Sequence, residues 1–200
     1  MKVVAVEHLT LDGVMQAPGR PDEDCRGGFQ HGGWAQPDND PVMGEAMAGG
    51  MANGEALLFG RRTYEDFAAI FPKQLNNPFT AVLTNSQKYV ASSTLQEPLP
   101  WENSTLLKGD AAEAVVRLKE KPGKDLVVLG SGVLVQSLMR RNLVDEYVLM
   151  IHPLVLGTGR RLFVDSGAFA ALRLVDVKTT TTGVIIATYR PAEPAGGRAT

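Results

Sequence analysis

The chain has 200 residues, of which 44% are hydrophobic, and its 20 basic residues nearly balance 22 acidic ones. This size and composition predict one compact domain, and a net charge of -2 without long charged runs argues against nucleic acid as a partner. No apolar run approaches the ~20 residues that cross a bilayer, and the first residues lack a signal peptide's apolar core, so we expect a cytoplasmic protein with no membrane partner.

The first part of the chain predicts a strand, a long loop and a helix. Residues 2–9 are mostly apolar and favour a strand. Residues 16–40 contain five glycines and three prolines, a composition typical of a functional lid or a disordered loop, although Trp34 favours order. Asp40 followed by Pro41 then predicts the start of a helix, because aspartate caps helices and proline suits their first position.

The next strand is predicted at residues 56–59, and it runs directly into Gly60-Arg61-Arg62-Thr63. Thr63 is typical of a helix cap, so the two arginines lie at a strand-to-helix junction. Arginine is unfavourable at the positive end of a helix dipole unless an anion also binds there. The junction therefore indicates a phosphate site, and a solvated arginine pair on a surface turn is the alternative.

The middle of the chain predicts two more strands and a helix. Residues 79–84 are expected to form a strand that ends in Thr84, Asn85 and Ser86, three short side chains that bind a phosphate or cap a turn. A turn-rich connection covers residues 88–100, and residues 104–107 form a short strand. Asp110, three residues before Glu113, then predicts a helix start.

A second strand-to-helix junction follows at residues 126–141. Four apolar residues predict a buried strand, Gly130-Ser131-Gly132 ends it, and a helix follows from Val133. Glycines let a ligand approach the backbone, and the N–H groups of the helix's first turn favour an anion. The dinucleotide fingerprint G-x-G-x-x-G is incomplete, because Val135 occupies its third glycine position. A tight turn without a ligand is the alternative.

The last third predicts a strand at residues 145–152, a glycine-arginine loop at residues 153–163, and an antiparallel edge hairpin of residues 171–178 and 182–190. Residues 191–200 are expected to be a disordered tail. The total is about eight strands and about four helices. Their order predicts a single α/β domain over residues 1–190, with a mostly parallel sheet and an antiparallel C-terminal edge.

Four motifs in this order resemble a known superfamily: Leu-Asp-Gly at residues 11–13, Phe-Gly-Arg-Arg-Thr-Tyr-Glu at 59–65, Gly-Ser-Gly-Val-Leu at 130–134 and Leu-Gly-Thr-Gly at 156–159. Together they look like the dihydrofolate-reductase-like superfamily. More narrowly, the chain is similar to the reductase domain of the bacterial bifunctional riboflavin-biosynthesis deaminase-reductase and its stand-alone relatives.

The resemblance implies an NADPH-dependent reductase that acts on a ribosylated aminopyrimidine or on another small heterocyclic or carbonyl compound. Its arginines suit the 2′-phosphate that distinguishes NADPH from NADH. The cofactor-binding residues that it implies are Gly60, Arg61, Arg62, Thr63, Thr84, Asn85, Ser86, Gly130, Ser131, Gly132, Val133 and Leu134. The substrate-binding residues that it implies are Trp34, Gly157, Gly159 and Arg160.

The reduction also needs a proton, which a carboxylic acid can supply. Asp38, which follows Trp34, is the candidate acid. Asp12 is a second candidate, with the alternative that it steadies the active-site loop.

His8, His31 and His152 show no spacing typical of metal ligands, so we expect no metal site. His8 could face the substrate or simply be packed.

Three functions remain open at the level of sequence: a reductase of the riboflavin type, a true dihydrofolate reductase, and a non-catalytic nucleotide-binding protein that keeps the cofactor cleft. We also expect a homodimer, from the resemblance and because an edge hairpin exposes backbone groups.

Overall fold

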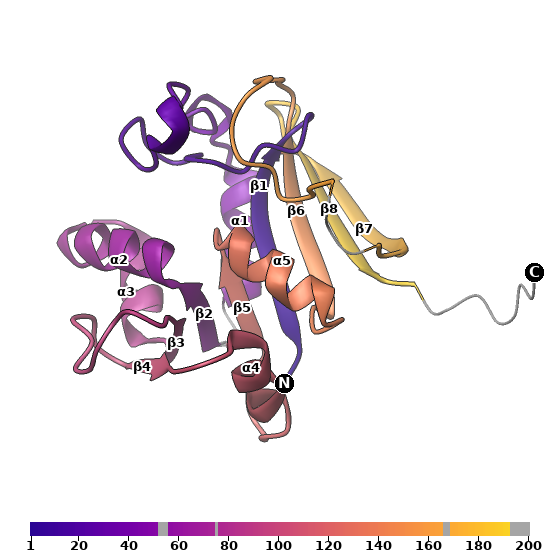
Figure 1. Cartoon of the computed structure of the whole chain (residues 1–200). Coiled ribbons are helices and arrows are strands. Elements are labelled where there is room, and N and C mark those ends of the chain that lie inside the picture. Colours follow the sequence, from indigo (N-terminus) through magenta and orange to yellow (C-terminus); the bar gives the residue numbers. More distant parts are fainter. Residues whose placement is uncertain (52–55, 75, 166–168, 193–200) are drawn as a thin grey trace, which may run out of the picture.

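The computed structural model describes residues 1–51, 56–74, 76–165 and 169–192. Within these ranges, eight strands form one sheet in the order β4-β3-β2-β5-β1-β6-β8-β7 (Figure 1). The strands are β1 (Val3–Thr10), β2 (Ala56–Gly60), β3 (Lys88–Ala91), β4 (Ser104–Leu107), β5 (Leu126–Leu129), β6 (Glu146–His152), β7 (Leu172–Thr179) and β8 (Ile185–Pro191).

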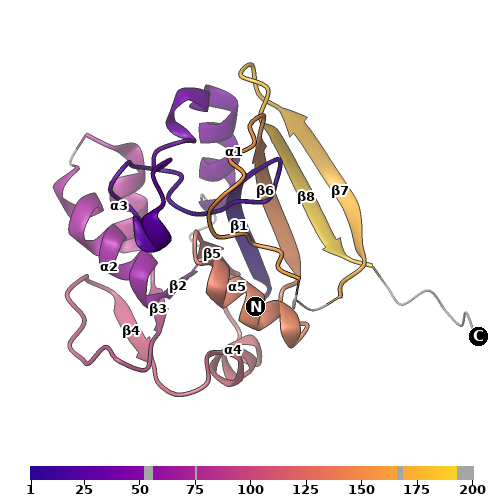
Figure 2. The ribbon, with the colours of Figure 1, turned by 45° about the horizontal axis from the view of Figure 1, so that its top comes forward.

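The sheet is mostly parallel. All pairs among β1 to β6 are parallel, whereas β8 pairs antiparallel with both β6 and β7. Figure 2 shows the β8–β7 hairpin along the sheet edge that lies away from the helices following β2. The predicted α/β sheet with an antiparallel C-terminal edge is therefore confirmed.

Five α-helices are present in the described ranges: α1 (Pro41–Met51), α2 (Arg61–Ile70), α3 (Pro78–Asn85), α4 (Ala111–Lys119) and α5 (Gly132–Arg140). Three short 3-10 helices join them, at Arg26–Gly28, Gln36–Asp38 and Phe71–Lys73. In the part of the chain that the structure describes, no helix has both the length and the apolar character to cross a bilayer.

The alternation of β1 explains why helices cover both faces of the sheet. Val3, Ala5 and Leu9 pack on one face with residues of α4 and α5, among them Leu134 and Leu138. Val4 and Val6 point to the other face, where they pack with residues of α1 and α2 (Figure 1). Burying each large aliphatic side chain contributes roughly 1.5–3 kcal/mol, so the two layers hold β1 and β5 in the centre of the fold.

The strand predicted at residues 79–84 is wrong, because this segment forms α3. Asn77 caps the helix by accepting a hydrogen bond from the Phe79 N–H at 2.9 Å, and Pro78 follows the cap. The strand that pairs with β2 is β3, which lies in the segment expected to be a turn-rich connection.

Two predicted boundaries also change. Helix α2 begins at Arg61, and its cap is Gly60, three residues before the cap expected at Thr63. Pro191, expected in the tail, ends β8, and the Ala192 N–H donates to the Ala171 carbonyl at 2.8 Å. Residues 193–200 of the expected tail lie outside the described residues.

Candidate active site

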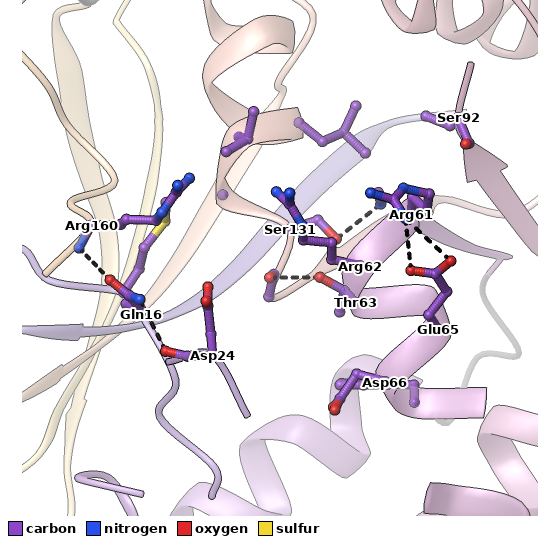
Figure 3. Close-up of a pocket in the computed structure, with 18 of the residues that line it drawn as sticks. Gln16, Asp24, Arg61, Arg62, Thr63, Glu65, Asp66, Ser92, Ser131 and Arg160 are labelled. Carbon is purple, nitrogen blue, oxygen red and sulfur yellow. Dashed lines mark hydrogen bonds and ion pairs between the residues drawn. The ribbon is translucent and has the colours of Figure 1, made fainter. Parts of the chain in front are cut away.

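A cleft with a volume of about 760 Å³ opens where β2, β3 and β5 end (Figure 3). Its walls come from the loop after β1, the first turns of α2 and α5, and the residues that follow β3. Of the predicted cofactor-binding residues, those that line it are Gly60, Arg61, Arg62, Thr63, Gly130, Ser131, Gly132, Val133 and Leu134. The structure thus brings the two predicted strand-to-helix junctions together in one cavity.

Short hydrogen bonds join the two junctions. The Ser131 hydroxyl accepts from the Gly60 N–H at 3.0 Å, and the Thr63 hydroxyl donates to the Gly130 carbonyl at 3.0 Å (Figure 3). Gly130 has a φ of +57°, which L side chains rarely adopt, and a Cβ on Gly132 would lie 1.8 Å from the Met15 sulfur. Both glycines therefore serve the close turn that starts α5.

The part of the cleft formed by the two helix N-termini is suited to an anion, although four acidic residues line other parts of it: Glu23, Asp24, Glu65 and Asp66. The first turns of α2 and α5 contain no acidic residue, and both helix N-termini lie in its wall. Arg61 pairs with Glu65 at 3.3 Å, whereas no ion pair is found for Arg62 or Arg160 within the described residues. Figure 3 shows Arg61 and Arg62 on one side of the cleft and Arg160 on the other.

The long loop after β1 is ordered over the cleft rather than a free coil. Arg20 forms two hydrogen bonds with Asp66 of α2, at 2.6 and 3.2 Å, and so ties the loop to the opposite wall. Gln16 donates to two carbonyls of the loop and accepts from the Arg160 N–H at 3.0 Å. The loop thus has a defined position beside the arginines.

Thr84, Asn85 and Ser86 do not line the cleft, because they end α3 instead of a strand. The carbonyls of Thr84 and Ser86 accept hydrogen bonds from the Lys88 ammonium at 2.9 and 2.8 Å. The polar residues that do follow the strand beside β2 are Ser92 and Ser93, and both line the cleft. Sequence reasoning missed them because it assigned β3 to a connection.

Three of the four predicted substrate residues lie outside the cleft lining, and only Arg160 belongs to it. Trp34 is buried, and its indole N–H donates to the Gln16 carbonyl at 2.7 Å. Gly159 has a φ of +110°, and a Cβ there would lie 2.7 Å from Phe29. The Gly157 N–H donates to the Asp12 carboxylate at 2.9 Å.

Asp12 also lies outside the cleft lining. Its carboxylate accepts from the Thr10 hydroxyl at 2.6 Å and from the Leu156 N–H at 3.2 Å, in addition to Gly157. These hydrogen bonds, with the Thr10 hydroxyl first, hold the pKa of Asp12 well below its ordinary value. An acid that stays ionised is a poor proton donor, so the contacts favour the alternative in which Asp12 steadies the loop.

Asp38 likewise does not line the cleft, and its carboxylate is hydrogen-bonded to the ring of His152 at 2.8 Å. His152 in turn contacts His8. These histidines are 144 residues apart, and only the parallel pairing of β1 with β6 brings them together. In the part of the chain that the structure describes, no cluster of three or more residues is arranged to hold a metal ion.

Glu7 is a buried carboxyl that sequence reasoning did not single out. Its side chain is 2% exposed, and its Oε1 atom has no hydrogen-bond partner among the described residues. Burial raises its pKa to about 8, partly offset by a hydrogen bond from the Ser131 backbone. The alternation of β1 was the available signal, because it places residue 7 on the same face as Val3 and Ala5.

Over residues 1–186 the sequence matches the RibD C-terminal domain. The chain belongs to the RibD C-terminal domain family. The sequence of this chain is also similar to two uncharacterized proteins of Bacillus subtilis strain 168. YyaP is 33% identical over 141 residues, which cover 68% of this chain and 73% of YyaP. YwjB is 28% identical over 127 residues, which cover 62% of this chain and 67% of YwjB.

Solved structures share the fold of this RibD C-terminal domain. A putative riboflavin biosynthesis protein from Shewanella sp. PV-4 superposes with a TM-score of 0.68 at 19% identity, covering 96% of this chain and all of that chain. Dihydrofolate reductase from Enterococcus faecalis, complexed with NADP(H), superposes with a TM-score of 0.62 at 14% identity, covering 96% of this chain and 97% of that chain. The fold is therefore dihydrofolate-reductase-like, and the resemblance inferred from the four motifs is confirmed.

Proposed function

We propose that the chain is an NADPH-dependent reductase of the riboflavin-biosynthesis type, which reduces a ribosylated aminopyrimidine such as 5-amino-6-(5-phosphoribosylamino)uracil. The observation that carries the proposal is the cleft in which two helix N-termini, a glycine turn and the side chains of Arg61, Arg62 and Arg160 converge. Membership of the RibD C-terminal domain family supports a reductase, and the NADP(H) complex of the Enterococcus dihydrofolate reductase supports the choice of cofactor.

The residues of the cleft fit a dinucleotide phosphate. The first-turn N–H groups of α5 and the turn Gly130-Ser131-Gly132 suit the pyrophosphate, which needs close backbone approach. Arg61 and Arg62, with Ser92 and Ser93 in the same cleft lining, suit the adenosine 2′-phosphate. When bound, the nicotinamide supplies the hydride, and the protein supplies position and a proton.

Replacing Arg61 and Arg62 with alanine is expected to weaken NADPH binding roughly 10- to 100-fold while changing NADH affinity less than about threefold, because charge-assisted contacts to the extra phosphate are lost. Dissociation constants from calorimetry, or from quenching of Trp101 fluorescence, measure both cofactors. Arg117→Ala on α4 is the matched control, because the Arg117 side chain is 62% exposed and lies outside the cleft lining. Equal losses for the two cofactors would contradict the assignment of these arginines to the 2′-phosphate.

The substrate is tested by steady-state NADPH oxidation with a panel of ribosylated aminopyrimidines and pterins. Turnover of the ribosylaminopyrimidine supports the proposal. Turnover of dihydrofolate alone would identify a true dihydrofolate reductase instead. Tight NADPH binding without consumption by any member of the panel would support a non-catalytic nucleotide-binding protein.

We further propose that a second copy of the chain covers β7. This strand is the last in the sheet, and exposed apolar side chains lie along it, including Leu174 and Val177, which are 53% and 51% exposed. Size-exclusion chromatography with light scattering is expected to give twice the chain mass, and Val177→Lys to give a monomer. Val116→Lys on α4, where the valine is 42% exposed, is the control. A monomeric unmodified protein would contradict the proposal.

A further inference from the structure

Three side chains that are distant in the sequence form one hydrogen-bonded chain. Asp38 Oδ2 lies 2.8 Å from His152 Nδ1, and His152 Nε2 lies 2.9 Å from His8 Nδ1. His152 is fully buried, with the Trp34 ring packed edge-on against it at 5.1 Å. The Asp38 carbonyl accepts from the Thr182 hydroxyl at 3.0 Å, so the acidic end is also held in place.

The His8 end of this hydrogen-bonded series lies where β1 and β5 stop pairing. Strand β1 pairs with β5 only as far as Val6 and Leu129, but it continues to pair with β6 as far as Thr10 and His152. His8 is therefore just beyond the last pair with β5. The helices that follow β5 and β1 cover opposite faces of the sheet. Such a switch point is where α/β sheets bind ligands.

The cleft lies at the same end of the sheet, although His8 is not among the residues that line it, so the reacting end of the substrate must extend beyond this lining to meet His8. The N–H of Gly130, which lines the cleft, donates to the Val6 carbonyl at 3.3 Å, so the glycine turn and His8 lie at the same end of these two strands. His8 is half-buried, and no hydrogen bond to its Nε2 atom is found among the described residues. His8 Nε2 is thus the free end of a series in which the other three imidazole nitrogens are hydrogen-bonded.

The hydrogen-bonded series Asp38–His152–His8 has two arrangements of hydrogen atoms, which differ by one proton. With Asp38 as a carboxylate, both histidines carry hydrogen on Nδ1, and His8 Nε2 presents a lone pair. With a proton on Asp38, both histidines carry hydrogen on Nε2, and His8 presents an N–H. Burial, and next the electrostatic effect of His152, lower the pKa of His8 to about 3. Both arrangements leave the His8 imidazole neutral, in agreement with this lowered pKa.

We propose that Asp38, His152 and His8 form a proton relay that serves the proposed reduction, in which His8 Nε2–H protonates the substrate. This inference rests on the proposed function. As the carbon of a substrate C=O or C=N bond receives hydride, the π electron pair moves to the oxygen or nitrogen, which takes the proton from His8 Nε2. His8 Nδ1 takes the hydrogen of His152 Nε2, and His152 Nδ1 takes that of Asp38.

The step leaves Asp38 as a carboxylate, and water returns one proton to the chain through His8. The relay explains how Asp38 can be the proton source expected from the sequence although it does not line the cleft. His8 is then the catalytic residue, and Asp38 and His152 position it and supply its proton.

The relay is tested first without cofactor or substrate, by nitrogen-15 NMR of histidine-labelled protein. The unmodified protein is expected to show a scalar coupling across the hydrogen bond between His152 Nε2 and His8 Nδ1, and the same tautomer at both rings. Asp38→Leu is expected to change the tautomer of both rings, while the exposed His31 stays unchanged and reports an intact fold. Absence of the coupling, or a His8 ring unaffected by Asp38→Leu, would overturn the relay.

The second test is kinetic. His8→Gln is expected to lower kcat for the ribosylaminopyrimidine roughly 100-fold or more, and to leave NADPH affinity within about twofold, because glutamine cannot pass a proton between two nitrogens. An unchanged kcat would also overturn the relay. If the unmodified protein fails to turn over this substrate, the proposed function has failed, and the NMR result still decides whether the hydrogen-bonded chain exists as described.

Discussion

Replacing Glu7 with glutamine is expected to stabilise the protein at pH 7.5 by an amount on the order of 3 kcal/mol, a rise in Tm of roughly 5–10 °C. Burial raises the pKa of Glu7 from its ordinary value of 4.5 to about 8. Between these values the folded chain holds a proton that the unfolded chain has released. Stability therefore falls as pH rises, by about 1.4 kcal/mol per pH unit for one proton.

Thermal unfolding between pH 5 and pH 8.5 measures this effect. The unmodified protein is expected to lose stability with rising pH, and Glu7→Gln to lose less, with a difference that grows up to pH about 8 and then levels off. Glu45→Gln is the matched control, because Glu45 is exposed at the start of α1. Parallel curves for the unmodified protein and Glu7→Gln would show that Glu7 is ionised in the folded state.

The position of Glu7 fits an anion site. It lies behind Ser131, whose backbone N–H donates to it, in the turn that we assign to the pyrophosphate. A carboxylate there would repel the cofactor's phosphates, whereas a neutral carboxyl does not. The burial that destabilises the folded state thus also keeps the Glu7 carboxyl behind this turn from adding a negative charge at neutral pH.

The two junctions that form the cleft could be predicted because their signals are local. A buried strand, a glycine and a helix start each follow from a few neighbouring residues, as in Gly130-Ser131-Gly132. Asp40-Pro41 was also sufficient to predict the start of α1, where Asp40 Oδ1 accepts from the Val42 N–H at 2.7 Å. The parallel sheet followed from the alternation of such units along the chain.

Asn77-Pro78 carries the same signal as Asp40-Pro41, a capping residue followed by proline, but this helix start was overlooked. The apolar run after it matched a strand by composition, but a cap followed by proline favours a helix, and the helix formed. Asp38 and His8 were each considered from the sequence, but the contacts that join them through His152 could not be predicted. Whether His8 meets His152 depends on the register of β1 against β6, and whether Asp38 reaches them depends on how the loop before α1 folds back. Neither is encoded in a short segment.

Lys88 anchors the end of α3, the helix that was predicted to be a strand. Lys88→Met is expected to lower the free energy of unfolding by roughly 3 kcal/mol. Its side chain is fully buried, and its ammonium donates to the carbonyls of Leu83, Thr84 and Ser86 at 2.8–2.9 Å. These carbonyls end α3 and lack partners within the helix. The Trp101 ring, 4.6 Å from the ammonium, adds a favourable cation–π contact.

Methionine keeps most of the volume of Lys88 but donates no hydrogen bond, so the Leu83 and Ser86 carbonyls lose the ammonium as a partner while the core stays filled. The Thr84 carbonyl keeps the Asn103 side-chain amide as a donor, at 3.1 Å. Denaturant unfolding measures the loss, with Lys73→Met as the control because Lys73 is exposed. A loss below about 0.5 kcal/mol would mean that water satisfies these carbonyls as well as Lys88 does. Because β3 begins at Lys88 and leads to Ser92 and Ser93, the variant is also expected to bind NADPH more weakly than the control.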